Sequence, residues 1–239
     1  WQIYDLFFRG YTKKQWGTDP RNLPASVPKR LPMRFDYDDR YFNHRYQAMP
    51  VEGYTAMVER MLDHPLIELR LNHRAGRAEM TAARHTFYSG PLDGYFDYDI
   101  GRLGYRTLDF EQFVVDGDWQ GCAVMNHCDE GVPFTRATEH KHFAPWERHE
   151  GSVITREYPR ACGPDDIPYY PIRLVQEKAL LRAYIERAQR LSGVTFLGRL
   201  GTYRYLDMDV AIREALDCTQ AFLEARRDGA EMPAFRAAV

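Results

Sequence analysis

The stretch Gly104-Tyr105-Arg106-Thr107-Leu108-Asp109-Phe110 is typical of a short β-strand, and similar runs on both sides of it decide the fold. Turns rich in Gly, Pro and Asp separate these runs, with no long helical pattern between them. Several short strands in succession favour an antiparallel sheet. The sequence therefore predicts an α+β fold with a six-stranded antiparallel sheet and flanking helices. The candidate strands are residues 67–71, 85–88, 104–110, 120–127, 134–142 and 153–158.

A strand–turn–helix unit is predicted near the C-terminal end of the chain. Residues 194–197 suit a strand, Gly198 begins a turn, and a long helical pattern runs from Asp207 to about residue 226. Asp207 is a favourable N-cap or first-turn residue. The positive end of that helix would suit an anion or a polarised ring edge. A preceding helix is expected over residues 174–191.

The N-terminal part of the sequence predicts a helix end followed by a long loop. Apolar residues recur at helical spacing from the start of the chain, and Gly10 is a plausible end of that helix. Residues 13–50 are expected to form an ordered, mostly non-helical loop, because prolines recur at every fourth position between 20 and 32. Short helices are expected over residues 53–62 and 92–96.

The composition is that of an ordinary globular protein, with 239 residues, 44% of them hydrophobic and 28% charged. The net charge of −2 gives no reason to expect a nucleic-acid partner. No apolar run approaches the roughly 18 residues of a membrane span, and the first residues do not resemble a signal peptide. The four cysteines form no C-x-x-C pair, so free thiols in a reducing cytoplasm are expected.

Neither phosphate-binding glycine motif, G-x-G-x-x-G or G-x-x-x-x-G-K-[ST], occurs in the chain. A nucleotide diphosphate would then need side-chain neutralisation, for which the forked guanidinium of arginine is best suited. Arg30 and Arg136 are the candidates, among 27 arginines. His140 and His142 would share one face of a predicted strand, but no further ligand lies at zinc-like spacing, so no metal is expected.

Nine blocks of sequence, in order along the chain, resemble the UDP-galactopyranose mutase family. Among them are Tyr11-Thr12-Lys13-Lys14-Gln15-Trp16-Gly17 and the proline-spaced segment around Arg30. The blocks are long and specific, and together they cover nearly all of the chain. They are residues 11–17, 29–35, 39–43, 50–55, 90–96, 105–108, 135–143, 169–172 and 198–209.

This resemblance implies a particular chemistry. Such enzymes bind FAD and interconvert UDP-galactopyranose and UDP-galactofuranose without net redox change, with the flavin in its reduced form. The flavin N5 would form an adduct with the sugar as UDP leaves, so the cofactor rather than a side chain would be the nucleophile. The expected partners are UDP-galactose and UDP-galactofuranose, and the expected assembly is a homodimer. The strict identity of the sugar stays open.

The resemblance also implies roles for individual residues. Arg30 and Arg136 would be the catalytic pair, clamping the diphosphate from opposite walls, and the loop around Arg30 would close over the substrate. The other substrate-binding residues would be Phe7, Tyr11, Thr12, Trp16, Tyr41, Asn126, Glu157, Tyr170 and Tyr205. The residues in contact with FAD would be Arg199, Tyr205, Asp207 and Met208.

The same resemblance divides the chain into three. Residues 1–62 would be the end of a helical domain with the mobile substrate loop, and residues 63–173 the antiparallel substrate domain. Residues 174–239 would be a helix and the βα unit that completes a Rossmann-like FAD domain. The family's N-terminal G-x-G-x-x-G segment is not among these residues, so a C-terminal fragment of the enzyme is expected, inactive by itself.

Two departures leave an alternative open. His44 stands where the family pattern has an Asp, and the missing glycine motif leaves no site for the ADP half of FAD. The first departure bears on the loop contacts alone. Because of the second, the alternative interpretation is a non-catalytic UDP-sugar-binding relative that keeps the arginine clamps but lacks FAD. An ordinary flavin oxidoreductase fits less well, because it leaves the two arginine motifs unexplained.

Overall fold

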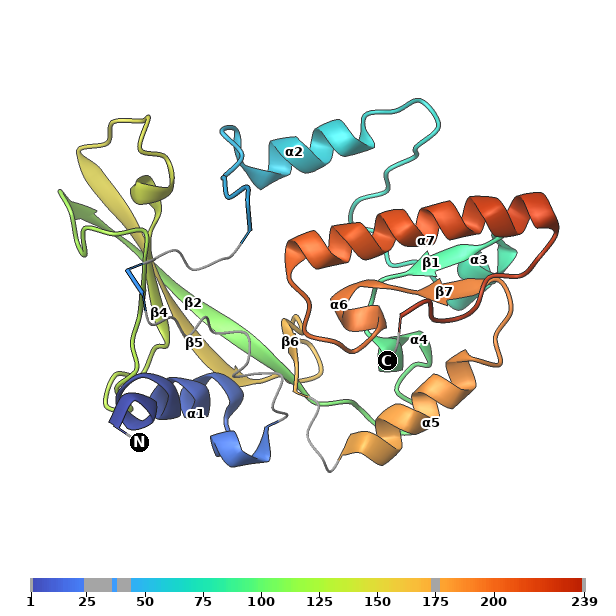
Figure 1. Cartoon of the computed structure of the whole chain (residues 1–239), viewed down its shortest axis with the longest axis horizontal. Helices are drawn as coiled ribbons and strands as arrows, with labels where there is room; N and C mark the ends of the chain where they lie inside the picture. Colours follow the sequence, from blue (N-terminus) through green and yellow to red (C-terminus); the bar gives the residue numbers. More distant parts are fainter. Residues whose placement is uncertain (1, 24–35, 38–43, 173–176, 238–239) are drawn as a thin grey trace.

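The computed structural model describes residues 2–23, 36–37, 44–172 and 177–237. Figure 1 shows two regions side by side. One is an antiparallel sheet with helix α1 (Gly10–Trp16) packed near its end. The other is an α/β region, in which helices α5 (Lys178–Ala188) and α7 (Met208–Asp228) lie on either side of two short strands. None of the described helices is both long and apolar enough to cross a membrane.

The antiparallel sheet follows the order β3-β4-β5-β2-β6. Its centre is the long pair of β2 and β5, in register from Arg106 opposite Ala161 to Asp116 opposite Gly151. The first four residues of β2 are buried and the rest are mostly exposed. The sheet is therefore packed against the rest of the protein at this end. The strands are β2 (Tyr105–Asp116), β3 (Val124–Asn126), β4 (Arg136–Glu139), β5 (Gly151–Ala161) and β6 (Tyr170–Pro171).

The antiparallel arrangement is confirmed. The predicted number of six strands is wrong, because within the described residues this sheet has five. Residues 67–71 form no strand, because their apolar side chains are exposed and alternation alone cannot supply a bonding partner. Strand β1 (Thr86–Tyr88) belongs to the other region, where it pairs in parallel with β7 (Val194–Phe196). The two-residue strand β6 is too short to give a sequence signal.

The parallel pair β1–β7 lies in the main hydrophobic core. The ring of Phe196 lies 5.0 Å from that of Tyr95, 5.7 Å from that of Tyr88 and 5.3 Å from that of Phe235. Burying aromatic side chains supplies most of the free energy in such a core. The buried members of this cluster are Leu92, Tyr95, Phe96, Leu103, Tyr105, Leu181, Tyr184, Ala188, Val194, Phe196, Tyr203 and Ala234.

The long C-terminal helices match the predictions closely. Helix α7 begins directly after Asp207, which occupies the N-cap position as expected. Helix α5 covers the centre of the predicted range 174–191, of which residues 174–176 lie outside the described part of the chain. The remaining helical elements are η2 (Pro20–Asn22), α2 (Gly53–Leu62), α3 (Arg77–Ala82), α4 (Leu92–Tyr95), η4 (His140–Phe143) and α6 (Gly198–Gly201).

The predicted helix end at Gly10 is wrong. A π-helical segment, η1 (Tyr4–Arg9), continues without a break into α1, so the first residues of the expected loop are helical. Gly10 is needed for close approach instead, since a Cβ there would lie 2.1 Å from the carbonyl oxygen of Cys128. The helix ends at Gly17, whose φ of 66° is left-handed and whose N–H donates to Lys13.

Replacing Gly10 with alanine tests this contact. In an open helix the substitution would stabilise the fold, because alanine has the higher helix propensity. Here we expect Gly10→Ala to lower the free energy of unfolding by about 1–3 kcal/mol, through overpacking against the loop. Gly76→Ala is the control, because no atom lies within 4 Å of its Cβ position. Denaturant unfolding that shows Gly10→Ala as stable as the parent would contradict the contact.

Candidate active site

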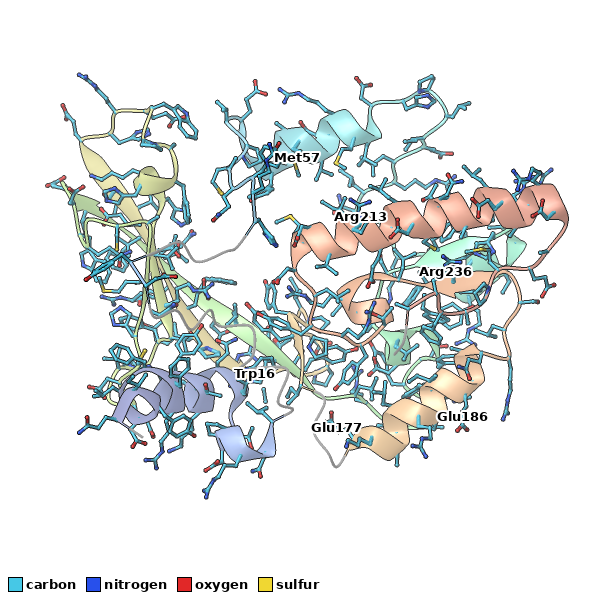
Figure 2. The ribbon with its side chains drawn as sticks, in the orientation of Figure 1. Trp16, Met57, Glu177, Glu186, Arg213 and Arg236 are labelled. Carbon is cyan, nitrogen blue, oxygen red and sulfur yellow. The ribbon has the colours of Figure 1, made fainter. Side chains whose placement is uncertain are left out.

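Three aromatic rings from distant parts of the chain meet where α1 ends beside the sheet. Trp16 is only 7% exposed, and Figure 2 shows it at the end of the helix nearest the sheet. Its ring centroid lies 6.2 Å from that of Tyr170 and 5.7 Å from that of Tyr205, which are themselves 5.5 Å apart. These edge-on contacts make a fixed surface, here called the aromatic wall: Trp16, Tyr170 and Tyr205.

Arg136 lies close to this wall, at the start of β4. Its Nε donates to Asn126 Oδ1 at 3.3 Å and its Nη2 to Tyr11 Oη at 3.5 Å, while Nη1 lies 3.6 Å from Glu157 Oε1. All three contacts are longer than the usual 2.7–3.2 Å of an N–H···O bond. About a third of the side chain is exposed, at 36%. The guanidinium is therefore held in place without its hydrogen-bonding capacity being used up.

The electrostatics of the cluster favour an anion. Burial raises the pKa of Tyr170 to about 12, with Tyr205 and Glu157 adding to the shift, and burial also raises the pKa of Tyr11. Both phenols are therefore neutral hydrogen-bond donors near neutral pH. Burial raises the pKa of Glu157, against the opposing charge of Arg136. The site therefore presents one arginine and several hydroxyl groups around the Glu157 carboxyl group, and the arginine and hydroxyls suit a phosphate group.

Arg199 supports the aromatic wall from behind. Its Nε and Nη2 donate to the Leu206 carbonyl at 3.1 and 2.5 Å, and its Nη1 donates to the Tyr169 carbonyl at 3.2 Å. The guanidinium also lies 4.7 Å from the ring of Tyr205 and 5.5 Å from that of Tyr170. These contacts fix the two tyrosines, and the predicted contact of Arg199 with FAD stays a prediction.

The remaining predicted residues are not part of these contacts or lie outside the described part of the chain. Phe7 is on η1, before Tyr11, and is 60% exposed. Thr12 is half-buried in α1, and Met208 is exposed as the first residue of α7. Arg30 and Tyr41 lie outside the described residues. The structure brings together Tyr11, Trp16, Asn126, Arg136, Glu157, Tyr170, Arg199 and Tyr205.

Arg106 is a residue with no role predicted from the sequence. From β2 its Nε donates to the Gln15 carbonyl at 2.9 Å and its Nη2 to the Lys14 carbonyl at 3.1 Å. A Cβ on Gly17 would lie 2.7 Å from Arg106 Nη1, so only glycine leaves room for this contact. A buried cation at a helix C-terminus is favourable, and this one sets the position of Trp16. In the sequence, Gly17 directly after Trp16 could have indicated the end of a helix, where a cation such as Arg106 can bind.

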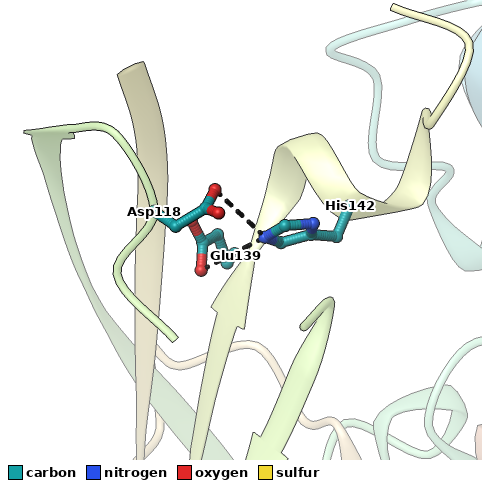
Figure 3. A group of neighbouring side chains, drawn as sticks. All are labelled: Asp118, Glu139 and His142. Atoms are coloured by element: carbon teal, nitrogen blue, oxygen red, sulfur yellow. Dashed lines mark ion pairs between the residues drawn. The ribbon is translucent and has the colours of Figure 1, made fainter. Parts of the chain in front are cut away.

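The two histidines after β4 do not share a strand face, contrary to the sequence prediction. The chain turns into η4 at residue 140, so His140 bonds to Thr155 Oγ1 at 2.8 Å while His142 contacts other residues. Figure 3 shows His142 Nε2 between Asp118 and Glu139, 3.6 and 3.5 Å from their carboxylate oxygens. This group of three is the one cluster of possible metal ligands in the described part of the chain.

Glu139 has a structural role that accounts for this cluster. Its buried carboxylate accepts the N–H groups of Trp119, Gln120 and Gly121 at 3.0, 2.7 and 3.1 Å, and the Ser152 hydroxyl at 2.5 Å. Burial raises its pKa, but these hydrogen bonds outweigh burial and hold the pKa at about 2. The carboxylate thus fixes residues 119–121, which is why β3 begins later than the sequence predicts.

Removing this carboxylate should weaken the fold in a pH-dependent way. The folded pKa lies below the unfolded value, so the contribution is complete above about pH 5 and is lost as the pH falls toward about 2. Glu139→Gln should lower the free energy of unfolding at neutral pH by about 2 kcal/mol and reduce its decline in acid. Glu147→Gln, an exposed control, should change it by less than about 0.5 kcal/mol. Equal acid sensitivity in Glu139→Gln and the parent, measured by denaturant unfolding, would refute the assignment.

Comparison with known proteins gives consistent matches. A sequence model of UDP-galactopyranose mutase matches residues 6–205. A probable UDP-galactopyranose mutase of Klebsiella pneumoniae is 57% identical, over 98% of this chain and 61% of its own length. A dTDP-fucopyranose mutase of Escherichia coli is 50% identical, over 95% of this chain and 62% of its own. The chain thus spans about three fifths of the length of these relatives.

A solved structure shows the same fold. The crystal structure of a reduced UDP-galactopyranose mutase superposes with a TM-score of 0.58 at 15% sequence identity. The match covers 85% of this chain and 61% of that one. At this level of identity the likeness speaks for the arrangement of the elements and not for individual side chains.

Proposed function

Because this chain belongs to the UDP-galactopyranose mutase family, we propose that it forms the nucleotide-sugar site of an isomerase that interconverts UDP-galactopyranose and UDP-galactofuranose. The observation that carries the proposal is the setting of Arg136. A half-buried guanidinium with long contacts to Tyr11, Asn126 and Glu157 lies beside the aromatic wall. A diphosphate can replace these long contacts with short, charge-assisted ones.

The described residues suggest how the substrate would lie. The diphosphate would accept hydrogen bonds from Arg136 and from the hydroxyls of Tyr170 and Tyr205. The uracil would stack near Phe7 and Tyr11 on the N-terminal helix, with Thr12 and Asn126 at its edge. Trp16 would pack beside the sugar or the nucleotide, and Glu157 would keep Arg136 oriented. By resemblance to the family, Arg30 and Tyr41, which lie outside the described residues, would complete the clamp.

The N-terminal end of α7 would suit the ring portion of a flavin. This 21-residue helix begins next to Tyr205 and Asp207, so its positive end would face a polarised ring edge, with Met208 beside it. When bound in its reduced form, FAD would supply the nucleophile that the side chains of the site do not. This chain's own residues would hold the ring, orient the sugar nucleotide and stabilise the departing diphosphate.

The proposal extends to the organisation of the chain. Residues 1–62 would carry the substrate loop, residues 63–173 the substrate-binding sheet, and residues 174–239 part of a Rossmann-like FAD domain. The parallel pairing of β1 with β7, which α7 covers in Figure 1, supports the Rossmann-like domain. By this pairing β1 would belong to that domain as well. A homodimer is the proposed assembly.

A second substrate class is favoured by one observation. The relative that is 50% identical is a dTDP-fucopyranose mutase, so a dTDP-sugar is the competing substrate for the same chemistry. Parallel assays of UDP-galactofuranose and dTDP-fucofuranose with dithionite-reduced full-length protein would decide between them. The sugar nucleotide with the larger kcat/KM is the substrate. UDP binding by a purified protein that carries no flavin would instead favour a non-catalytic UDP-sugar-binding relative.

Substituting Arg136 tests the proposed site. In the full-length protein we expect Arg136→Ala to raise the Kd for UDP at least about tenfold and to abolish turnover, because a charge-assisted hydrogen bond is lost. The visible absorbance of bound flavin should be unchanged. Arg227→Ala is the control, since this exposed arginine pairs only with its neighbour Asp228 among the ion pairs of the described residues. Wild-type turnover in Arg136→Ala would refute the role.

A further inference from the structure

Lys14 makes a set of contacts that the proposed site does not use directly. From α1 its ammonium reaches the loop between β3 and β4 and lies 2.8–3.0 Å from four backbone carbonyl oxygens. An ammonium carries three N–H groups, so four acceptors share three donors and surround the charge with dipoles. We call these acceptors the carbonyl cage: the oxygens of His127, Asp129, Val132 and Phe134.

The carbonyl cage joins the two sides of the candidate site. Lys14 is in the same helix as Tyr11, whereas the loop that it holds runs from Asn126 in β3 to Arg136 in β4. The contact from Arg136 to Tyr11 therefore crosses the boundary between α1 and the β3–β4 loop, which Lys14 also bridges. Asn126 and Arg136 are themselves held in the sheet, so a shift between α1 and this loop would change the distance from Tyr11 to Arg136.

Two neighbouring contacts cross the same boundary but cannot fix it alone. Gly10 allows the helix to approach the Cys128 carbonyl, which permits a short distance without enforcing it. Lys13 pairs with Glu130 at 2.6 Å, with both side chains about half exposed, and such surface pairs contribute little. The four-oxygen contact of Lys14 is partly buried, so it dominates this boundary.

We propose that Lys14 is a positioning residue for the nucleotide-diphosphate site: it holds the β3–β4 loop against α1 and so sets the separation of Arg136 from Tyr11. The inference rests on the proposed function, because it assumes that this separation is matched to a bound diphosphate. Lys14 itself does not touch the ligand. Misplacement of a binding group by as little as about 1 Å can be costly in an organised site.

The test is UDP affinity in Lys14→Met. Methionine keeps the apolar stem but removes every N–H, so the four carbonyls lose their shared donor and the loop must move. By calorimetry on the full-length protein, well below its unfolding temperature, we expect the Kd for UDP to rise at least about tenfold. Lys13→Met, the neighbouring control, should change it less than about twofold. The flavin absorbance of both variants should match that of the wild type.

A double variant separates positioning from general stability. If Lys14 acts through Arg136, then Lys14→Met combined with Arg136→Ala binds UDP no more weakly than Arg136→Ala alone. Losses that multiply would overturn the proposal, as would a Kd within twofold of wild type in a folded Lys14→Met. If the wild type binds no UDP, the proposed function fails and this inference fails with it.

Lys14→Arg keeps the proposal testable if the methionine variant does not fold. Arginine retains the charge, but its planar guanidinium is larger than an ammonium and cannot take the same place among four carbonyls. We therefore expect a rise in the UDP Kd of about threefold or more, despite the conserved charge. A wild-type Kd in Lys14→Arg would show that the loop position does not matter, and would overturn the proposal.

Discussion

The close approach of α1 to the β3–β4 loop is the contact on which the candidate site depends. A helix with a side chain at position 10 could not lie against the Cys128 carbonyl, because the Cβ position is only 2.1 Å from that oxygen. Once the helix is this close, Lys14 reaches the loop and Arg106 reaches the last carbonyls of the helix. Trp16 is then buried against two tyrosines that come from elsewhere in the chain.

The arginines of the site differ in how far their hydrogen bonds are used. Arg106 and Arg199 donate to backbone carbonyls at ordinary distances, and these contacts hold Trp16, Tyr170 and Tyr205 in place. Among the described residues, the polar contacts of Arg136 are all long, to a phenol, an amide and a carboxylate. An anion would therefore form its strongest new hydrogen bonds with Arg136. Binding an anion at Arg106 would instead break the hydrogen bonds that Arg106 donates to the last carbonyls of α1.

Much of this arrangement follows from the sequence, and the exceptions have physical causes. The helix near the C-terminus is read correctly because its apolar period and its N-cap Asp207 agree. Gly10 is misread because glycine ends helices and also permits close packing, and only the neighbouring chain distinguishes these uses. The strands at residues 86–88 and 194–196 are both predicted. Their pairing with each other is not, because parallel pairing between distant segments leaves no local signal in the sequence.

The aromatic wall draws its three rings from positions 16, 170 and 205, and Arg136 contacts a residue 125 positions away. Contacts of such long range form late, because the chain must first close large loops. During synthesis, α1 leaves the ribosome long before the residues that cover its apolar side. Its exposed face would then need protection until the last third of the chain has been made, so the order of synthesis runs against the order in which the site can assemble.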